Sequence, residues 1–280
     1  MSFNRTCVVE FDTKVGGKRV VKRISGLNVR FSVHFPMSAV VAEAEIGICN
    51  LKRSDLELLT TYTSKAIAIN QRKRIRVFAG YSDTQTALIF GGDIFEAKPT
   101  EPPDVWLNIK ATSVNYATTQ IFTRQILVPT SLQTVADQSA KALGLSLEWN
   151  SSLYKTIDKF SFSGNVNEMI SRINKLADIN AFIENDRLVV VDRDDPARSD
   201  KIVEISEQYG MIGIPKVTFI GFEAKVLLNT NIRRGDKVEL KSSRIPAANG
   251  IYYVYHITHE GELRGQPWYT TIDARRNKPS

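Results

Sequence analysis

The sequence is poor in the residues that build covalent cross-links and metal centres. It contains 2 cysteines and 3 histidines among 280 residues. Two cysteines are too few for a disulfide framework or a cysteine-rich metal site, so we expect folding in a reducing cytoplasm. No apolar run approaches the roughly 20 residues that span a bilayer, and the segment after Met1 lacks the apolar stretch of a signal peptide. We therefore expect no direct membrane insertion and no secretion signal.

Sequence patterns for catalysis are also missing. The chain contains no Gly-x-Ser-x-Gly elbow, phosphate loop or dinucleotide fingerprint. His256 and His259 differ by three positions in an expected strand, so they point to opposite faces and do not converge on one metal. We predict that they are imidazoles on the polar face of a sheet, and that Cys7 and Cys49 are small, half-buried strand residues. The sequence thus predicts no catalytic, cofactor-binding or metal-binding residue, no cofactor and no enzyme.

One enzymatic alternative stays open. The chain has 30 acidic residues, and two carboxylates are sufficient for glycoside cleavage. Nothing in the sequence singles out such a pair.

Composition is that of a soluble globular protein, with 42% hydrophobic and 24% charged residues and a net charge of +7. This length favours two or three domains. The densest basic cluster is Arg72–Arg76, which we interpret as the start or charged edge of a strand. No zinc-finger or RNA-binding signature accompanies it. Arg234-Gly235-Asp236 matches the integrin-binding tripeptide, but we predict a hairpin turn there because glycine permits the required backbone.

Residues 1–118 show the period-two alternation of half-buried strands. A hairpin turn is expected at Asp12–Gly17, with Arg19–Ile24 as the returning strand. Pro36 ends the next strand, whose apolar face starts at Val29. We expect a short helix to begin with a capping box at Ser54–Glu57 and to pack on the sheet through Leu56, Leu59 and Tyr62.

In residues 119–200 the apolar period changes from two to 3.6. Capping boxes at Thr130–Gln133 and Asn165–Glu168 predict two amphipathic helices, and Gly144 ends the first of them. A hairpin is expected to turn at Asn185–Asp186. The polar, proline-containing stretch Asp192–Asp200 then marks a boundary. These features predict a small α+β domain.

Residues 201–280 return to the β pattern, and the stretch from Leu227 to Arg275 is its centre. Trp268, Thr270 and Ile272 share one face of the last expected strand. The C-terminal tail after Arg275 is expected to fray. The fold class that we predict is mainly β with an α+β module: two β-barrel, tube-like domains at 1–118 and 201–280 that flank an α+β domain at 119–200.

The C-terminal stretch also carries a resemblance. It reads Leu-x-x-x-Ile-x-x-Gly-Asp-x-Val-x-Leu over 228–240, then Gly-x-Tyr-x-Val-x-x-Ile-x-His-x-Gly over 250–261, then Trp268-x-Thr270. This order resembles the closing barrel of baseplate hub proteins in contractile-tailed phages such as Mu. An upstream echo spans Ile46–Leu51, Arg53–Leu56, Ile75–Tyr81 and Ile89–Ile94. In that family the same order makes a first barrel.

The resemblance implies a structural hub of a contractile tail, located in the virion baseplate and assembled in the host cytoplasm. Such a hub is expected to be a homotrimer around the DNA channel that joins the sixfold tail tube to the threefold spike. Its expected partners are the central spike protein, tail tube or tube-initiator proteins, surrounding baseplate proteins and the tape measure protein. Sequence-specific nucleic-acid binding is not expected.

The competing hypothesis is a nucleic-acid-binding β-barrel module, which the basic charge and the aromatic content suggest. We expect Trp268, Tyr253 and Phe31 on apolar faces, whereas a base-stacking platform needs exposed aromatics interleaved with Lys and Arg. Tight, salt-sensitive DNA binding would favour this alternative.

Overall fold

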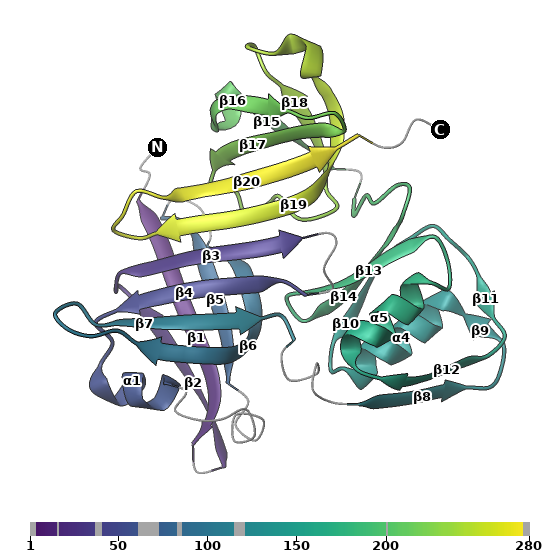
Figure 1. The fold of residues 1–280 in the computed structure, drawn as a ribbon, viewed down its shortest axis with the longest axis horizontal. Coiled ribbons are helices and arrows are strands. Elements are labelled where there is room, and N and C mark those ends of the chain that lie inside the picture. Colours follow the sequence, from purple (N-terminus) through teal and green to yellow (C-terminus); the bar gives the residue numbers. More distant parts are fainter. Residues whose placement is uncertain are drawn as a thin grey trace.

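The computed structural model describes residues 4–15, 17–36, 41–60, 73–82, 86–114, 121–199 and 201–276. The protein is mainly β with short α-helices, as the sequence predicts. Figure 1 shows a long curved sheet formed by the N-terminal and C-terminal parts of the chain, with the middle part beside it. Among the described residues, no helix is long and apolar enough to cross a membrane.

The N-terminal part of the sheet, here called the first β-unit, contains seven strands in the order β3-β4-β7-β6-β5-β1-β2. A short helix, α1 (Arg53–Leu59), follows β4. The strands are β1 (Arg5–Val15), β2 (Lys18–Ser25), β3 (Val29–Pro36), β4 (Glu43–Cys49), β5 (Arg74–Tyr81), β6 (Ala87–Pro99) and β7 (Trp106–Thr112).

The C-terminal part, the second β-unit, follows the order β16-β17-β20-β19-β18-β15. Short 3-10 turns at Glu207–Tyr209 and Pro246–Ala248 connect some of its elements. The strands are β15 (Ile202–Ser206), β16 (Met211–Val217), β17 (Gly221–Leu227), β18 (Lys237–Lys241), β19 (Gly250–Glu262) and β20 (Trp268–Arg275).

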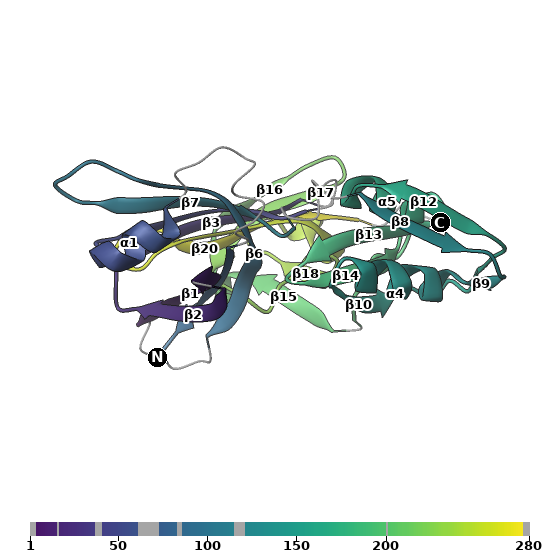
Figure 2. The ribbon, with the colours of Figure 1, turned by 90° about the horizontal axis from the view of Figure 1, so that it is seen from below.

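The two β-units share one sheet. β3 pairs antiparallel with β19, from Pro36 opposite His256 to Arg30 opposite Glu262. In the described part of the chain this junction produces a single 13-stranded sheet, with a hydrophobic core that draws on both units. The view in Figure 2 shows that the outer strands β1, β2, β15 and β18 lie in a second layer, below β3, β7, β17 and β20. The pairing of the described strands does not close either unit into a barrel.

The two β-units repeat one strand arrangement. Across the sheet, β3-β4-β7-β6-β5 of the first unit corresponds to β16-β17-β20-β19-β18 of the second. Asp93 of β6 pairs with β5 on one side and with β7 on the other, and Tyr253 of β19 pairs likewise with β18 and β20. Two positions later each strand has a one-residue bulge, at Phe95 and at Tyr255. The repeat therefore extends to the register of individual residues.

The units differ at their outer edges. β1 runs antiparallel to β5, whereas β15 runs parallel to β18. The β1–β2 hairpin extends the first unit by one strand for which the described second unit has no counterpart.

The middle of the chain forms the α+β module. A three-stranded sheet in the order β10-β14-β13 and two short strand pairs, β8 with β12 and β9 with β11, surround two helices. The module has its own apolar core. Its elements are β8 (Phe122–Ile126), β9 (Thr130–Ser131), α4 (Leu132–Ala142), β10 (Ser146–Asn150), β11 (Thr156–Ile157), β12 (Phe160–Gly164), α5 (Val166–Asn174), β13 (Ile179–Glu184) and β14 (Arg187–Asp192).

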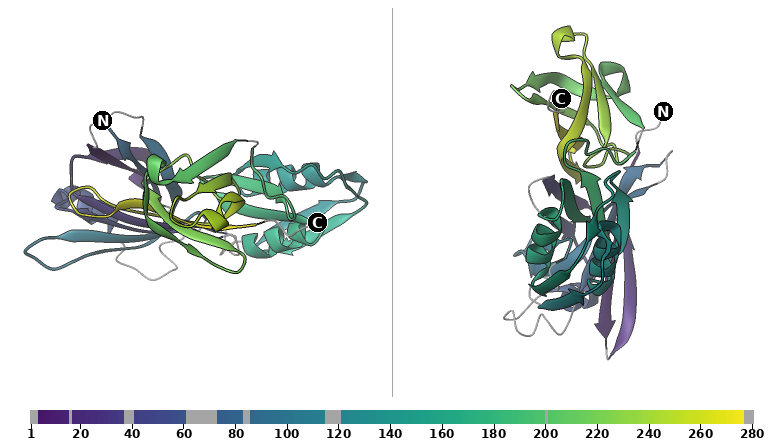
Figure 3. Two further views of the ribbon diagram at one scale, coloured as in Figure 1. Left: turned by 90° about the horizontal axis from the view of Figure 1, so that it is seen from above. Right: turned by 90° about the vertical axis from the view of Figure 1, so that its right-hand side faces the viewer.

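The module lies beside the sheet, near the ends of its strands, in the views of Figures 1 and 3. The sequence did not predict β8, which precedes the first helix of the module. The expected hairpin between β13 and β14 is confirmed, because Asn185 and Asp186 both have positive φ, at 46° and 68°.

The helix caps agree only in part with the sequence. Asn165 and Glu168 form the expected capping box at α5. α4 is capped by Ser131, whose hydroxyl accepts from the Thr134 amide, rather than by Thr130. The capping box expected at Ser54–Glu57 is wrong, because α1 begins at Arg53 and Ser54 already lies inside its first turn.

Other local expectations are corrected or lie outside the described residues. The first hairpin turns only after Val15, because β1 continues through the region expected to turn. β5 begins at Arg74, inside the basic cluster, so the expected strand start is confirmed. The alternative of a sheet edge is wrong, because β5 pairs on both sides. Within the cluster, Lys73 donates to the Leu58 and Thr60 carbonyls at the end of α1, 2.7 and 3.1 Å away. Arg72, Tyr62 and the tail after Arg276 lie outside the described residues.

Candidate functional site

One face of the sheet is polar along the strand order β16-β17-β20-β19-β3-β4-β7-β6, and we call it the polar face. Register places Lys225, Thr271, Thr258, His34 and Glu43 in one row across β17, β20, β19, β3 and β4. In the next row Glu45 lies between Ser32 and Lys110, which in turn lies opposite Glu96. The opposite face of the same strands packs into the common core. The polar face thus continues across the junction between the two β-units.

Acidic and basic side chains alternate on the polar face. Lys98 and Glu96 form an ion pair at 3.1 Å, and so do Lys216 and Glu223. A depression of about 690 Å³ lies on this face. Its lining includes Arg30, Glu45, Glu96, Lys110, Glu260 and Tyr269. Charges of both signs give a solvated surface without a strong field of one sign.

Two of the three histidines face this surface. The rings of His34 and His256 lie 6.5 Å apart, and His34 Nδ1 is 3.1 Å from the Thr258 hydroxyl. His259 points to the other side, as its spacing from His256 predicts, but it is buried in the core and not on a polar face. Its Nδ1 is 2.9 Å from the Thr270 hydroxyl, and burial lowers its pKa to about 4. His259 is therefore a neutral core residue at neutral pH.

The described residues contain no group of three or more His, Cys, Asp or Glu side chains that could hold a metal ion. Cys7 lies in β1 and Cys49 at the end of β4, and both are buried more deeply than the sequence pattern suggested. Burial raises the pKa of the Cys7 thiol to about 12. Because the thiolate is the nucleophilic form, Cys7 is unreactive at neutral pH.

The tripeptide Arg234-Gly235-Asp236 forms a turn, but β17 and β18 on either side of it are not paired, so it is not a hairpin. Gly235 has φ +86°, as a left-handed turn position requires. Arg234 and Asp236 are buried. An integrin-type ligand needs an exposed tripeptide, so this turn has a structural role.

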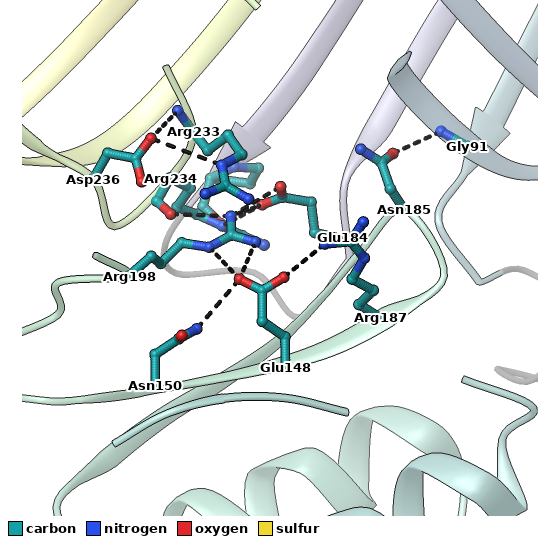
Figure 4. A network of polar contacts seen from close by, with 11 residues as sticks. Gly91, Glu148, Asn150, Glu184, Asn185, Arg187, Arg198, Arg233, Arg234 and Asp236 are labelled. Atoms are coloured by element: carbon teal, nitrogen blue, oxygen red, sulfur yellow. Dashed lines mark hydrogen bonds and ion pairs between the residues drawn. The ribbon is translucent and has the colours of Figure 1, made fainter. Parts of the chain in front are cut away.

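A buried ionic junction, drawn in Figure 4, joins the module to the sheet. Arg198 donates from Nη1 to both oxygens of Glu184, at 2.9 and 3.0 Å, and from Nε to Glu148 at 2.9 Å. Its Nη1 also donates to the Arg234 carbonyl at 3.3 Å. Glu148 and Glu184 belong to β10 and β13 of the module. Arg198 therefore connects the module to the turn that precedes β18.

The charges at this junction compensate one another. Burial by itself would raise the pKa of Glu148, but the charge and hydrogen bonds of Arg198, with further hydrogen bonds from Arg187 and Asn150, hold it below its usual value. Arg234 is fully buried, lies 3.6 Å from the centre of the Phe182 ring, and donates to the Pro36 carbonyl at 2.5 Å. Desolvation lowers its pKa to about 10, so it stays charged at neutral pH.

The same edge of the module also contacts the first β-unit. The Asn185 side-chain oxygen accepts from the Gly91 amide at 2.8 Å, and Arg74 forms an ion pair with Asp186. The β13–β14 turn is thus held by β5 and β6, while Arg198 and, from the second unit, Arg234 contact Glu184, the residue directly before that turn. The sequence did not predict these residues as partners. Arg198 lay in the expected boundary segment, and Arg234 was read only as part of a turn.

The chain belongs to a family of phage tail proteins: the family model "Baseplate hub gp41" matches residues 8–274. No curated protein matches. Among solved structures, the 43 kDa tail protein of prophage MuSo2 from Shewanella oneidensis is 10% identical, with a TM-score of 0.63 over 96% of this chain and 97% of that one. The tail protein from Neisseria meningitidis MC58 is also 10% identical, with a TM-score of 0.60 over 96% and 97%.

A third similar structure is the c3393 protein of E. coli, described as a component of the type VI secretion system and as similar to the T4 bacteriophage tail proteins gp27 and gp5. It is 11% identical, with a TM-score of 0.59 over 95% of this chain and 77% of that one. Identities this low show a common fold. Together with the family match, they make this chain a structural component of a phage tail baseplate, and hence of the virion, as the sequence motifs predicted.

Proposed function

We propose that this chain is a trimeric adapter that joins a sixfold tail tube to a threefold central spike. The observation that carries the proposal is the repeat, in which the two β-units have the same strand order, the same register and the same bulge position. Three copies of a chain with two such units present six similar units in a ring. A single copy, with its units side by side in one sheet, supplies one third of that ring.

The polar face is proposed to line the channel of this ring. It crosses both β-units without interruption, and the apolar side of the same strands is already covered by core. Side chains of both charges suit a wall along which DNA moves without being held. In the assembled ring we expect the open sheets to curve into the two tube-like barrels that the sequence analysis predicted, at 1–118 and 201–280.

The module at 119–200 is proposed to lie at the periphery, in contact with the surrounding baseplate proteins. Its position beside the sheet, near the strand ends, supports this assignment. The spike is expected to bind one rim of the ring, and tube or tube-initiator proteins the other, with the tape measure protein as a further partner. The hub is expected to act without catalysis and to assemble in the host cytoplasm.

A nucleic-acid-binding module is the second candidate, and one observation favours it. On the polar face, Lys225 lies 3.9 Å from the Tyr269 ring centre and Arg30 lies 4.5 Å from that of Trp106. The bases of single-stranded nucleic acids stack on aromatic rings that lie beside cationic side chains. Trp268 and Phe31 are buried as expected, whereas Tyr253 is only partly buried, and its neighbour Tyr252 is the core residue.

The deciding experiment is a reconstruction of the assembled tail, or of a co-expressed hub–spike complex if the free chain stays monomeric. We expect three copies of this chain around the axis with the polar face towards the channel. Six copies or one copy would contradict the adapter. Filter binding tests the second candidate, because a phosphate-binding surface gives affinity that falls steeply between about 50 and 200 mM salt.

A further inference from the structure

The positive charge of the protein is concentrated in one layer. The chain has 37 basic and 30 acidic residues. β1, β2, β5 and α1, with Lys52 and Lys73 directly before α1 and β5, contain eleven Lys or Arg residues and four Asp or Glu residues. The remainder of the sequence therefore has equal numbers of basic and acidic residues. The excess of +7 belongs to the outer layer of the first β-unit and to the helix that contacts it.

This layer has an outer face that points away from the polar face. Val9 and Phe11 of β1 are buried in the common core, so the residues that alternate with them face outward. In that outward set Arg23 of β2 lies opposite Glu10 of β1, and Glu10 lies opposite Arg76 of β5. The core separates this surface from the polar face, and Figure 2 shows β1 and β2 in the lower layer. We call it the basic face; it consists of Lys14, Arg19, Val21, Arg23 and Arg76 around Glu10 and Asp12.

Cations outnumber carboxylates on the basic face, since four cations share two carboxylates. Arg19 Nε donates to both oxygens of Asp12 at 3.0 Å, and this hydrogen bonding holds the pKa of Asp12 below its usual value. Arg23 Nη1 lies 3.8 Å from Glu10. The side chains of Arg19 and Arg23 are nevertheless 66% and 64% exposed. Both guanidinium groups therefore have donors left for a further carboxylate.

An exposed apolar side chain lies between the two arginines. Val21 of β2 is 53% exposed and faces outward, opposite Asp12. Because a strand rises about 3.4 Å per residue, Arg19 and Arg23 stand roughly 13 Å apart with Val21 midway between them. Interfaces between proteins combine an apolar centre with a polar rim and are enriched in arginine. The basic face has this composition.

Protection of a sheet edge does not account for these arginines. β2 is the last strand of the sheet in the described part of the chain, and charged side chains keep such edges from pairing with other chains. Lys22 already has this role, because it lies opposite the buried Phe11, on the inner side of β2, and forms an ion pair with Asp55 of α1. Arg19 and Arg23 point to the other side, where they are free to meet a partner.

We propose that the basic face binds an acidic surface of another baseplate protein. That surface would present two carboxylates about 13 Å apart, opposite Arg19 and Arg23, with an apolar side chain between them that covers Val21. The planar guanidinium group binds a carboxylate through two parallel hydrogen bonds, and Asp12 shows that Arg19 is oriented to do so. The inference goes beyond the proposed adapter, because it needs a place in the baseplate but no particular number of copies.

A protein fits the basic face better than a uniform polyanion does. DNA or an anionic lipid surface would bring phosphates against Glu10 and Asp12 as well as against the arginines, and contacts between like charges are unfavourable. A folded protein can place its carboxylates beside the cations alone. The basic face also lies on the opposite side of the core from the polar face, which is proposed to line the DNA channel.

A photo-cross-link from the centre of the basic face tests the contact directly. Val21 is replaced by a photoreactive benzophenone amino acid, and assembled, purified tails are irradiated. We expect a cross-link to a different baseplate protein, at an apolar residue that has an Asp or Glu on each side in the strand or on the surface that carries it. A cross-link only to another copy of this chain or to DNA, or no cross-link, would overturn the proposal.

Charge removal provides a second test. Arg19→Gln with Arg23→Gln should lower the amount of this chain in purified tails, relative to the tail tube protein, at least about tenfold. The isolated double variant should melt close to wild type, because exposed ion pairs contribute little to stability. The matched control is Lys241→Gln with Arg244→Gln, which removes two exposed cations from the second β-unit and should incorporate normally. Full incorporation of the arginine variant would contradict the proposed contact.

Binding measurements distinguish the protein partner from the other polyanions. The isolated wild-type chain is tested against duplex DNA by filter binding and against phosphatidylglycerol vesicles by flotation. We expect the arginine variant and its control to behave alike in both assays. Binding that only the arginine variant loses would assign the basic face to nucleic acid or to lipid and overturn the proposal.

These outcomes are separate from those of the adapter. Three copies per tail without the Val21 cross-link would overturn the basic face as a contact and leave the adapter standing. Six copies or one copy with the cross-link present would overturn the adapter and leave the contact standing.

Discussion

Phe31 of β3 and Trp268 of β20 meet edge to face, with ring centres 5.5 Å apart and planes at 67°. One belongs to the first β-unit and the other to the second. Trp268 is buried, and the Arg5 guanidinium carbon lies 5.4 Å from its ring centre. The start of the chain and its last strand therefore converge on one tryptophan, which helps to join the two units.

Trp268→Ala should destabilise the protein by roughly 3–5 kcal/mol, because it removes a buried aromatic and leaves a cavity at the junction. Denaturant unfolding measures the change. Tyr209→Ala, at an exposed aromatic of the second unit, is the control and should stay within about 0.5 kcal/mol of wild type. Unfolding of Trp268→Ala at the wild-type midpoint would mean that the ring contributes little to the core.

Arg198→Met should destabilise the protein by roughly 3–5 kcal/mol, because Glu184 and Glu148 would keep their charges without their main partner. The matched control is Arg193→Met, which removes the exposed 3.4 Å ion pair with Asp178 and should cost at most about 1 kcal/mol. Hydrogen exchange should also show faster exchange where β13 and β10 meet the sheet. Equal effects of the two substitutions would argue against the junction as the attachment of the module.

Stability should fall as the pH drops from about 6.5 towards 4, in part through His259. Its pKa is about 4 in the folded protein and about 6.5 in an unfolded chain. Between these values the unfolded state binds more protons, so acid favours unfolding. For this residue we expect a loss of roughly 2 kcal/mol between pH 7 and pH 4.5.

The measurement is the free energy of unfolding as a function of pH. His259→Gln should flatten the dependence in this window, although its stability at pH 7 will differ from wild type. A slope that persists in His259→Gln would assign the acid sensitivity to other groups.

Gly235→Ala should destabilise the protein by more than backbone strain explains. The left-handed φ costs an alanine roughly 1–3 kcal/mol, and the new Cβ would lie 2.8 Å from the Pro196 carbonyl oxygen. Gly144→Ala is the control, because Gly144 also has positive φ but nothing within 4 Å of its would-be Cβ. Thermal melts of the two variants should differ by several degrees. Equal melting temperatures would show that the Pro196 segment moves freely aside.

The sequence predicted most individual elements. Alternation of Val29, Phe31, Val33 and Phe35 predicted β3, and the Asn165–Glu168 box predicted the start of α5. Such signals lie in a few neighbouring residues, so tertiary context was not needed to read them. The wrong predictions fell where the local signal was weak, or where two neighbouring residues carried the same signal. Ser54–Glu57 has the residues of a capping box, but the N-cap of α1 is Lys52, two positions earlier. Tyr253 was expected on the apolar face, where its neighbour Tyr252 lies instead.

Sequence alone therefore determined most of the strands, the approximate positions of the helices, the absence of a recognisable catalytic motif and the baseplate hub resemblance, because each depends on residue type and spacing. Only the tertiary structure decided that β3 joins β19, that Arg198 meets both Glu184 and Glu148, and that Arg234 lies beside Glu184. Those facts depend on contacts between residues far apart in the sequence, such as Arg30 and Glu262, which pair across the junction. Alternation along a strand specifies which side chains face inward, but not which strand lies next to it.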